Sequence, residues 1–180
     1  MNKAVLIGIP ILIIVAIAGS AILTYNGLVS ANISVDQSWG DIQVQYQRRA
    51  DLIPQVINAT KLYINYEQKL LTDITNARSA WAKSLQGSIA DQVNATQTLD
   101  SVTSRLQTVL IIENYPDLKG NQVVLTLIDE LEGTENRIAV ARTRFNQAVA
   151  DYNGKVLTFP NNIVAGSFGF QQKPYFKAIE

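Results

Sequence analysis

The sequence predicts an all-α protein in which a single N-terminal transmembrane helix is followed by an elongated up-and-down four-helix bundle. Three observations predict this fold: a long uncharged run near the N-terminus, apolar residues spaced by three and four through most of the remaining chain, and turn signals that divide that chain into four segments. A kinked three-helix bundle is the alternative. We expect an anchor at residues 1–24, a bundle at 25–157 and an aromatic-containing tail at 158–180.

The predicted anchor rests on the residues between Ala4 and Leu23, which hold no charged side chain over 20 positions. A helix of that length spans about 30 Å, the thickness of a bilayer's hydrocarbon core. A cleaved signal peptide is the alternative, because Ala18–Ala21 are small residues. The apolar run is longer than a typical signal core, which favours a retained anchor.

Lysine placement predicts the orientation of the anchor. Lys3 precedes the apolar run, and the next basic residue is Arg48. Positive residues favour the cytoplasmic side, so we expect a single-pass protein of the cell membrane with a cytoplasmic N-terminus and the bundle outside.

Each of the four segments carries a stripe of apolar residues, the pattern of helices that pack at shallow angles in bundles and coiled coils. The stripes are Leu28, Val35, Trp39, Ile42, Tyr46 and Ile53; Tyr63, Tyr66, Leu70, Ile74, Ala77 and Trp81; Leu99, Val102, Leu106 and Val109; and Leu127, Leu131, Thr134, Ile138, Ala141, Phe145, Ala148 and Tyr152.

Turn residues set the predicted boundaries between the segments. Gly87 separates the second from the third, with Ser88 as an N-cap, and Asn121 is expected to cap the fourth. Between the first and second, Asp51–Pro54 favours a turn because proline suits the first turn of a new helix. A kinked continuation through Pro54 is the alternative.

Composition argues against catalysis and nucleic-acid binding. The chain has no histidine and no cysteine, which removes the commonest general base, thiolate nucleophiles and the usual metal ligands. Fifteen basic and fifteen acidic residues give zero net charge, without the basic face that phosphate binding requires. We therefore expect no enzyme activity and no catalytic residues, cofactor, metal or nucleic-acid partner.

Two groups of charged residues fall on or near the stripes. Arg49 continues the first stripe, so we expect a buried ion pair with Glu113 or Glu67, which would fix helix register. Glu135, Arg137, Arg142 and Arg144 are interpreted as a solvated face of the fourth segment.

The tail and three sequons are the remaining candidates. In a bundle that returns to the membrane, Phe168, Phe170, Tyr175 and Phe176 would lie at the bilayer surface, or would cover the bundle's end or a neighbouring subunit. Asn32, Asn58 and Asn94 begin Asn-X-Ser/Thr sequons and are candidate glycosylation sites.

Several stretches, in this order and spacing, resemble the LemA family over nearly the whole chain after the anchor. They are Tyr25–Val29; Trp39 and Gln47–Pro54; Ile74–Arg78; Glu113–Lys119; Glu135–Ala139 with Ala141 and Arg142; Tyr152 and Asn153; and Phe159–Ala165. One departure is Tyr66 before Glu67, where a histidine is common in the family, so a family role that needs a proton donor there is in doubt.

The resemblance implies a helical bundle on one N-terminal span, with no enzymatic activity established for the family. One relative is associated with forming intracellular membrane compartments in magnetic bacteria. We therefore expect a non-enzymatic scaffold or membrane-organising protein that contacts the lipid bilayer and associates with itself as a homo-oligomer, or with envelope proteins. The alternative is a subunit of an extracellular filament, because an apolar helix that runs into an amphipathic one is also a pilin-like layout.

Overall fold

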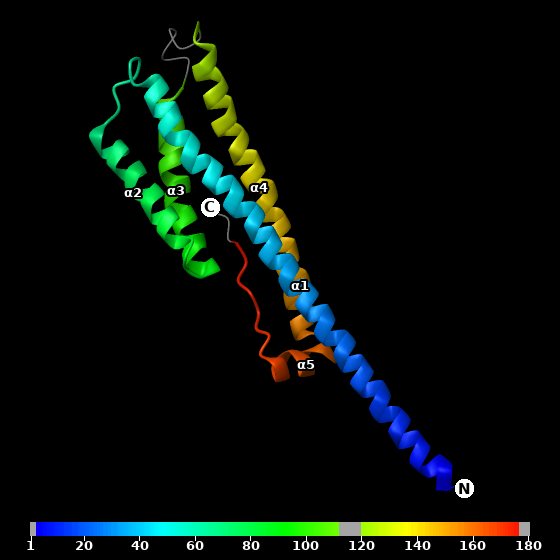
Figure 1. Cartoon of the computed structure of the whole chain (residues 1–180). Coiled ribbons are helices and arrows are strands. Elements are labelled where there is room, and N and C mark those ends of the chain that lie inside the picture. The colour runs from blue at the N-terminus through cyan, green and yellow to red at the C-terminus, as the bar shows by residue number, and fades with distance from the viewer. Residues whose placement is uncertain (1–2, 112–119, 177–180) are drawn as a thin grey trace. The chain divides into compact units, whose positions relative to one another are not determined.

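The computed structural model describes residues 3–111 and 120–176, with side-chain surroundings from residue 8 onward, and its regular elements over these ranges are α-helices (Figure 1). This confirms the predicted all-α class. The helices are α1 (Lys3–Thr60), α2 (Gln68–Ser84), α3 (Ile89–Val109), α4 (Gln122–Leu157) and α5 (Asn161–Phe168).

The chain forms two compact units. The first unit comprises Met1–Ser38 and Arg144–Tyr175, and the second comprises Trp39–Thr143 and Phe176–Glu180. Helices α1 and α4 each contribute one part to each unit, whereas α2 and α3 belong to the second unit and α5 to the first.

Helix α1 corrects the predicted boundary between the first two segments. It continues through Pro54 to Thr60, so the turn expected at Asp51–Pro54 is wrong and the chain leaves the helix at residues 61–67. Proline has no N–H, which deprives the carbonyl of Ala50, four residues earlier, of its helical partner. Arg78 Nε donates to that carbonyl at 2.7 Å, which satisfies it without a break in the helix.

The second unit packs the later part of α1, helices α2 and α3, and the first part of α4 around one core. The stripe residues of α1 in this unit, Trp39, Ile42, Tyr46 and Ile53, are all buried, as are Leu70, Ile74, Ala77 and Trp81 of α2. From α3 and α4 the core receives Leu99, Val102, Leu106, Val124, Ile128, Leu131, Thr134, Ile138 and Ala141.

The predicted caps of α3 and α4 are confirmed. Ser88 Oγ accepts from the backbone N–H of Asp91, whose carboxylate accepts from the N–H and hydroxyl of Ser88 in return. These hydrogen bonds lower the pKa of Asp91. Asn121 Oδ1 accepts from the backbone N–H of Val124 at 3.3 Å. Both caps satisfy backbone donors that have no partner inside their helix.

The first unit packs the beginning of α1 against the end of α4 and against α5. Its buried side chains include Leu28 and Val35 of α1, Phe145, Val149, Tyr152 and Val156 of α4, and Ala165 of α5. Helix α5 lies within the predicted tail and begins at Asn161. A cis peptide bond joins Phe159 to Pro160 before α5, and Gly169, with φ of 76°, follows it.

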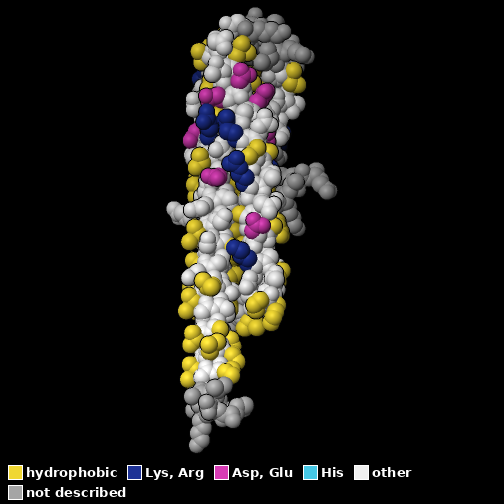
Figure 2. All heavy atoms as spheres, turned by 90° about the vertical axis from the view of Figure 1, so that its right-hand side faces the viewer, with side chains coloured by type: hydrophobic (Ala, Val, Ile, Leu, Met, Phe, Trp, Pro, Cys, Tyr) yellow, Lys and Arg dark blue, Asp and Glu magenta, His cyan; other side chains and the backbone are white. Residues whose placement is uncertain are grey.

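The N-terminal stretch of α1 carries apolar side chains that nothing in the structure covers. From Gly8 to Ser20 every residue is exposed, including Leu12 and Ile14. Among the described residues, α1 is the one helix long and apolar enough to cross a membrane, with a window of mean hydropathy 2.2 of which no residue is buried. The face in Figure 2 shows hydrophobic and no charged side chains at this end.

Candidate functional site

A buried cluster of charged and aromatic side chains lies in the second unit, around the carboxylate of Asp100 on α3. The hydroxyl of Tyr46 donates to both carboxylate oxygens, at 2.9 and 3.0 Å. Arg49 Nη1 donates to Oδ1 at 2.5 Å, and Arg142 Nη2 donates to Oδ2. One acceptor group thus joins side chains of α1 and α4 to α3.

Arg49 is fully buried, with 0% of its side chain exposed. It pairs with Asp100 and also with Glu135 of α4, whose side chain is 47% exposed. Burial lowers the pKa of Arg49, and the charge of Asp100 opposes that shift. The positive charges of two guanidinium groups balance the negative charges of two carboxylates. Buried charges are tolerated when they are paired in this way.

Aromatic rings enclose the two guanidinium groups. The Tyr46 ring lies 5.2 Å from Arg49 and 5.6 Å from Arg142, and the Phe176 ring lies 4.4 Å from Arg142, distances typical of cation–π contacts. Trp81 of α2 packs against Tyr46 with ring centroids 5.4 Å apart. Through Trp81 the cluster contacts all four helices of the second unit.

The surroundings of Tyr46 decide what chemistry the cluster can perform. Burial, reinforced by the charge of Asp100, raises the pKa of Tyr46 to about 12. The phenol is therefore neutral at physiological pH and acts as a hydrogen-bond donor rather than a base. No group of three or more potential metal ligands occurs among residues 3–111 and 120–176. The arrangement suits the fixing of helix register better than catalysis.

A second polar contact lies on α1 and α3. Gln92 Oε1 accepts from the indole N–H of Trp39 at 2.8 Å and from Gln43 Nε2 at 2.7 Å. Its amide nitrogen donates to the carbonyl of Gly87 at 3.2 Å. A buried glutamine with these three partners orients the start of α3 against α1.

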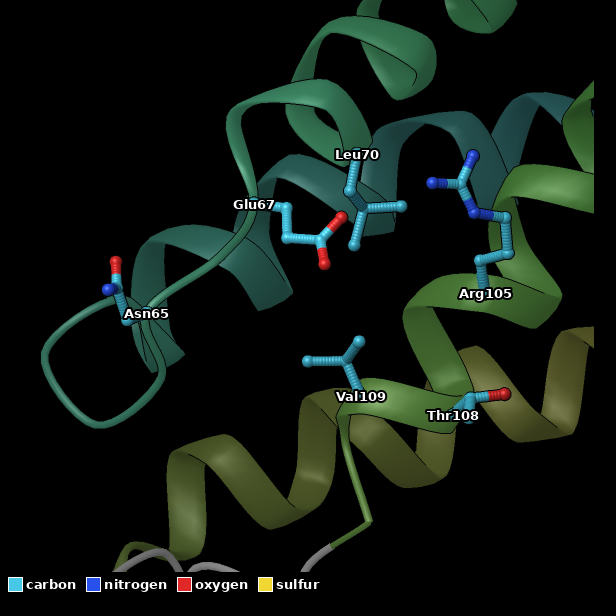
Figure 3. Close-up of a pocket in the computed structure, with 6 residues that line it drawn as sticks. All are labelled: Asn65, Glu67, Leu70, Arg105, Thr108 and Val109. Atoms are coloured by element: carbon cyan, nitrogen blue, oxygen red, sulfur yellow. The ribbon is translucent and has the colours of Figure 1, made fainter.

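The structure tests one of the two partners predicted for Arg49, because Glu113 lies outside the described residues. Glu67 is exposed at the start of α2 and lines a cavity of about 350 Å³. In Figure 3 its carboxylate lies near Leu70 and Val109, while Asn65 points away. Arg105, on the rim of the same cavity, donates to Asp73 at 2.7 Å.

The sequence gives less indication of the carboxylates that pair with Arg49 than of Arg49 itself. The predicted solvated face of α4 is wrong for Glu135 and Arg142, which the structure brings to the cluster, whereas Arg137 and Arg144 are exposed. Asp100 belongs to a buried polar stripe on α3, formed by Gln92, Thr96, Asp100 and Thr103. The spacing of these polar residues by three and four is the feature of the sequence that indicates a shared buried face.

Two of the tail aromatics contact the end of the apolar run in the first unit. The Tyr25 ring lies 4.8 Å from the Phe168 ring and 5.7 Å from the Phe170 ring, between centroids. Tyr175 is exposed. Nearby, Lys173 Nζ donates to Asp36 at 2.6 Å, and its backbone N–H donates to Asn153 at 2.8 Å, which fastens the tail to α1 and α4.

Phe176 packs inside the second unit. Its side chain is 3% exposed and stacks on Trp39 with ring centroids 6.4 Å apart. The guanidinium of Arg142 also lies over this ring, so Phe176 is part of the second unit's core.

The three sequons lie within helices rather than loops. Asn32 and Asn58 are in α1 and Asn94 is in α3. Asn32 is half-buried and donates to Asp36 at 3.2 Å, whereas the other two are exposed. Their glycosylation stays a prediction.

Comparison with known proteins identifies the family. The model of the LemA family matches residues 38–180. The chain is 25% identical to Protein LemA of Metamycoplasma hominis over 155 residues, which cover 86% of this chain and 69% of that protein. It is 22% identical to Magnetosome protein MamQ 2 of Paramagnetospirillum magneticum and to Magnetosome protein MamQ of Magnetospirillum gryphiswaldense, with 94% and 95% of this chain and 70% and 71% of those proteins covered. The chain therefore belongs to the LemA family.

Proposed function

We propose that the protein is a non-enzymatic scaffold that is anchored in a membrane by the N-terminal part of α1. The observation that carries this proposal is the exposed apolar stretch from Gly8 to Ser20. In water, a patch of this size promotes association or precipitation, whereas in a bilayer the same side chains are solvated by lipid and the helix satisfies its own backbone groups.

The second unit supports a structural role for the rest of the chain. The polar cluster around Asp100 is largely buried, charge-balanced and held by helix-to-helix hydrogen bonds, with the Tyr46 phenol protonated. Such a cluster fixes how α1, α3 and α4 align. A bundle with a fixed register presents the same surface to every partner, as a scaffold requires.

We propose self-association, or association with envelope proteins, as the activity of that surface, with the cytoplasmic N-terminus and external bundle predicted from Lys3. Two relatives are named magnetosome proteins, which agrees with a role at membranes. Among the described residues, exposed apolar side chains such as Val44 and Val140 are available to a partner.

Electron microscopy of the full chain in native-like membranes tests the proposed association. We expect rings or sheets of repeated bundles. Isolated monomers at all protein densities would contradict the scaffold, and regular filaments would favour the pilin-like alternative.

Labelling of a single introduced cysteine tests the orientation separately. The chain contains no native cysteine that would react as well. Ala80 is exposed on α2, so Ala80→Cys offers one thiol on the bundle. A membrane-impermeant maleimide should label it in intact cells. Labelling only after lysis would place the bundle in the cytoplasm.

A further inference from the structure

Helix α5 contacts α1 at the position where the apolar run ends. Thr24 Oγ1 donates to Asn161 Oδ1 at 3.5 Å, and the rings of Tyr25 and Phe168 are in contact. Because the 20 uncharged residues up to Leu23 cover about 30 Å, residues 24 and 25 fall at the boundary between hydrocarbon and headgroups. The contact with α1 therefore holds α5 at that depth.

The segment around α5 exposes more apolar surface than a water-facing element needs. Leu157, Phe159, Ile163 and Phe168 are 58–75% exposed, while Ala165 is buried toward the rest of the first unit. On α1, Ile22 and Leu23 are exposed next to this contact. The surface is thus continuous with that of the apolar run, and α5 runs across α1 rather than along it (Figure 1).

A cavity of about 180 Å³ lies between α1 and α5, beside the contact of Tyr25 with Phe168. Ala21, Ile22, Tyr25 and Phe168 line it, and none of these side chains carries a charge. A cavity with such walls does not hold water well, because water needs polar partners. A hydrocarbon chain needs none.

A positive side chain lies on the other side of the boundary. Lys155 Nζ lies 3.5 Å from the carbonyl of Gly27, two residues beyond Tyr25. Lysine and tyrosine at this depth suit the headgroup zone, where an ammonium group meets lipid phosphates and a tyrosine ring spans the polarity gradient.

We propose that α5 is an interfacial helix that lies in the headgroup zone of the bilayer, and that a lipid acyl chain fills the cavity between α5 and α1. This inference rests on the proposed anchoring of α1. It commits the apolar surface of α5 to lipid, because that surface continues the one that enters the bilayer.

The test uses the full chain in vesicles of phosphatidylcholine and phosphatidylglycerol, with one fluorescent label on Leu12→Cys, Ile163→Cys or Ala80→Cys. Lipids carrying a nitroxide at a shallow or a deep position quench labels at the corresponding depth. We expect Leu12→Cys to be quenched most by the deep nitroxide, Ile163→Cys at least threefold more by the shallow than by the deep one, and Ala80→Cys by neither.

The outcomes separate the two proposals. A label at Ile163→Cys that behaves like the one at Ala80→Cys, while the Leu12→Cys label is quenched, would overturn the interfacial helix and leave the anchor intact. An unquenched label at Leu12→Cys would overturn the anchor. Burial of the Ile163→Cys label that depends on protein dilution, without lipid quenching, would show a second copy there and also overturn the inference.

A pair of substitutions on α5 adds a control for charge. With the label at Phe159→Cys, Ile163→Asp should lower shallow quenching at least threefold, because it places a charge on the apolar surface. Asn162→Asp adds the same charge one residue away, at a position that is already polar, and should leave quenching unchanged. Equal effects of the two substitutions would count against a lipid-facing Ile163.

Discussion

Arg78 Nε donates to the backbone carbonyl of Ala50 at 2.7 Å. Pro54, four residues after Ala50, has no N–H to give to that carbonyl, so a side chain of α2 replaces a hydrogen bond missing from α1. This contact explains how α1 passes through a proline without ending. It also ties α2 to α1 at a defined position.

A double-mutant cycle between positions 78 and 54 tests this replacement. Arg78→Met should lower the free energy of unfolding by about 1–3 kcal/mol, because the Ala50 carbonyl loses its partner. With Pro54→Ala, the backbone N–H at position 54 bonds the carbonyl, so the same Arg78→Met change should cost clearly less. Denaturant unfolding in detergent measures both. Equal costs in the two backgrounds would mean that Arg78 acts independently of the proline.

Asp100 is expected to be the most sensitive acidic position in the second unit. Asp100→Asn leaves the guanidinium groups of Arg49 and Arg142 without their shared countercharge, which should destabilise the protein by about 3–5 kcal/mol. Asp73→Asn is the control: it breaks a pair with the exposed Arg105, and a much smaller change is expected. Similar thermal midpoints for the two variants would show that burial of the cluster is energetically unimportant.

Tyr46 should titrate at unusually high pH. Burial raises its pKa to about 12, above the ordinary value of about 10. The folded state therefore binds this proton more tightly, so the associated stability is complete below pH 10 and is lost as pH rises through about 12. Subtracting the ultraviolet tyrosinate signal of Tyr46→Phe from that of the unsubstituted chain isolates this group. A midpoint at the ordinary value would contradict its burial.

Asp73 should retain its charge to lower pH than an ordinary aspartate. The hydrogen bond from Arg105 lowers the pKa of its carboxyl, with a smaller contribution from Lys69. A carboxyl whose pKa is lowered by folding stabilises the protein at pH values above its ordinary pKa. That stabilisation is lost as the pH falls through the folded-state pKa. Arg105→Gln should move the carboxyl pKa, followed by NMR, back upward. No movement would exclude Arg105 as the cause.

Much of the fold follows from hydrophobic spacing alone. All six stripe residues assigned to the first segment are buried, as are Leu131, Thr134, Ile138, Phe145 and Tyr152 of α4. The prediction missed the boundary near Pro54 because local preference disfavours proline inside a helix. The contact that compensates comes from Arg78, 28 residues away from Ala50, and no local pattern contains it.

The buried cluster was only partly predictable. Arg49 stands out in the sequence because a charge on an apolar stripe is unusual. Its partners do not stand out, because Asp100 lies on a polar stripe of α3 and Glu135 of α4 is half exposed. Which carboxylate meets an arginine depends on how helices align, and spacing within one helix does not specify that.

Alkaline extraction of isolated membranes tests whether the N-terminal part of α1 holds the protein in a bilayer. We expect the full chain to stay in the membrane pellet. A chain with Leu12→Arg and Ile14→Arg should be released, since each arginine at the centre of a span disfavours insertion by about 2.5–3.5 kcal/mol. Ser34→Arg with Gln37→Arg, which adds the same residues at exposed positions beyond the apolar run, should leave the protein in the pellet. Release of the unsubstituted chain into the supernatant would contradict this anchoring.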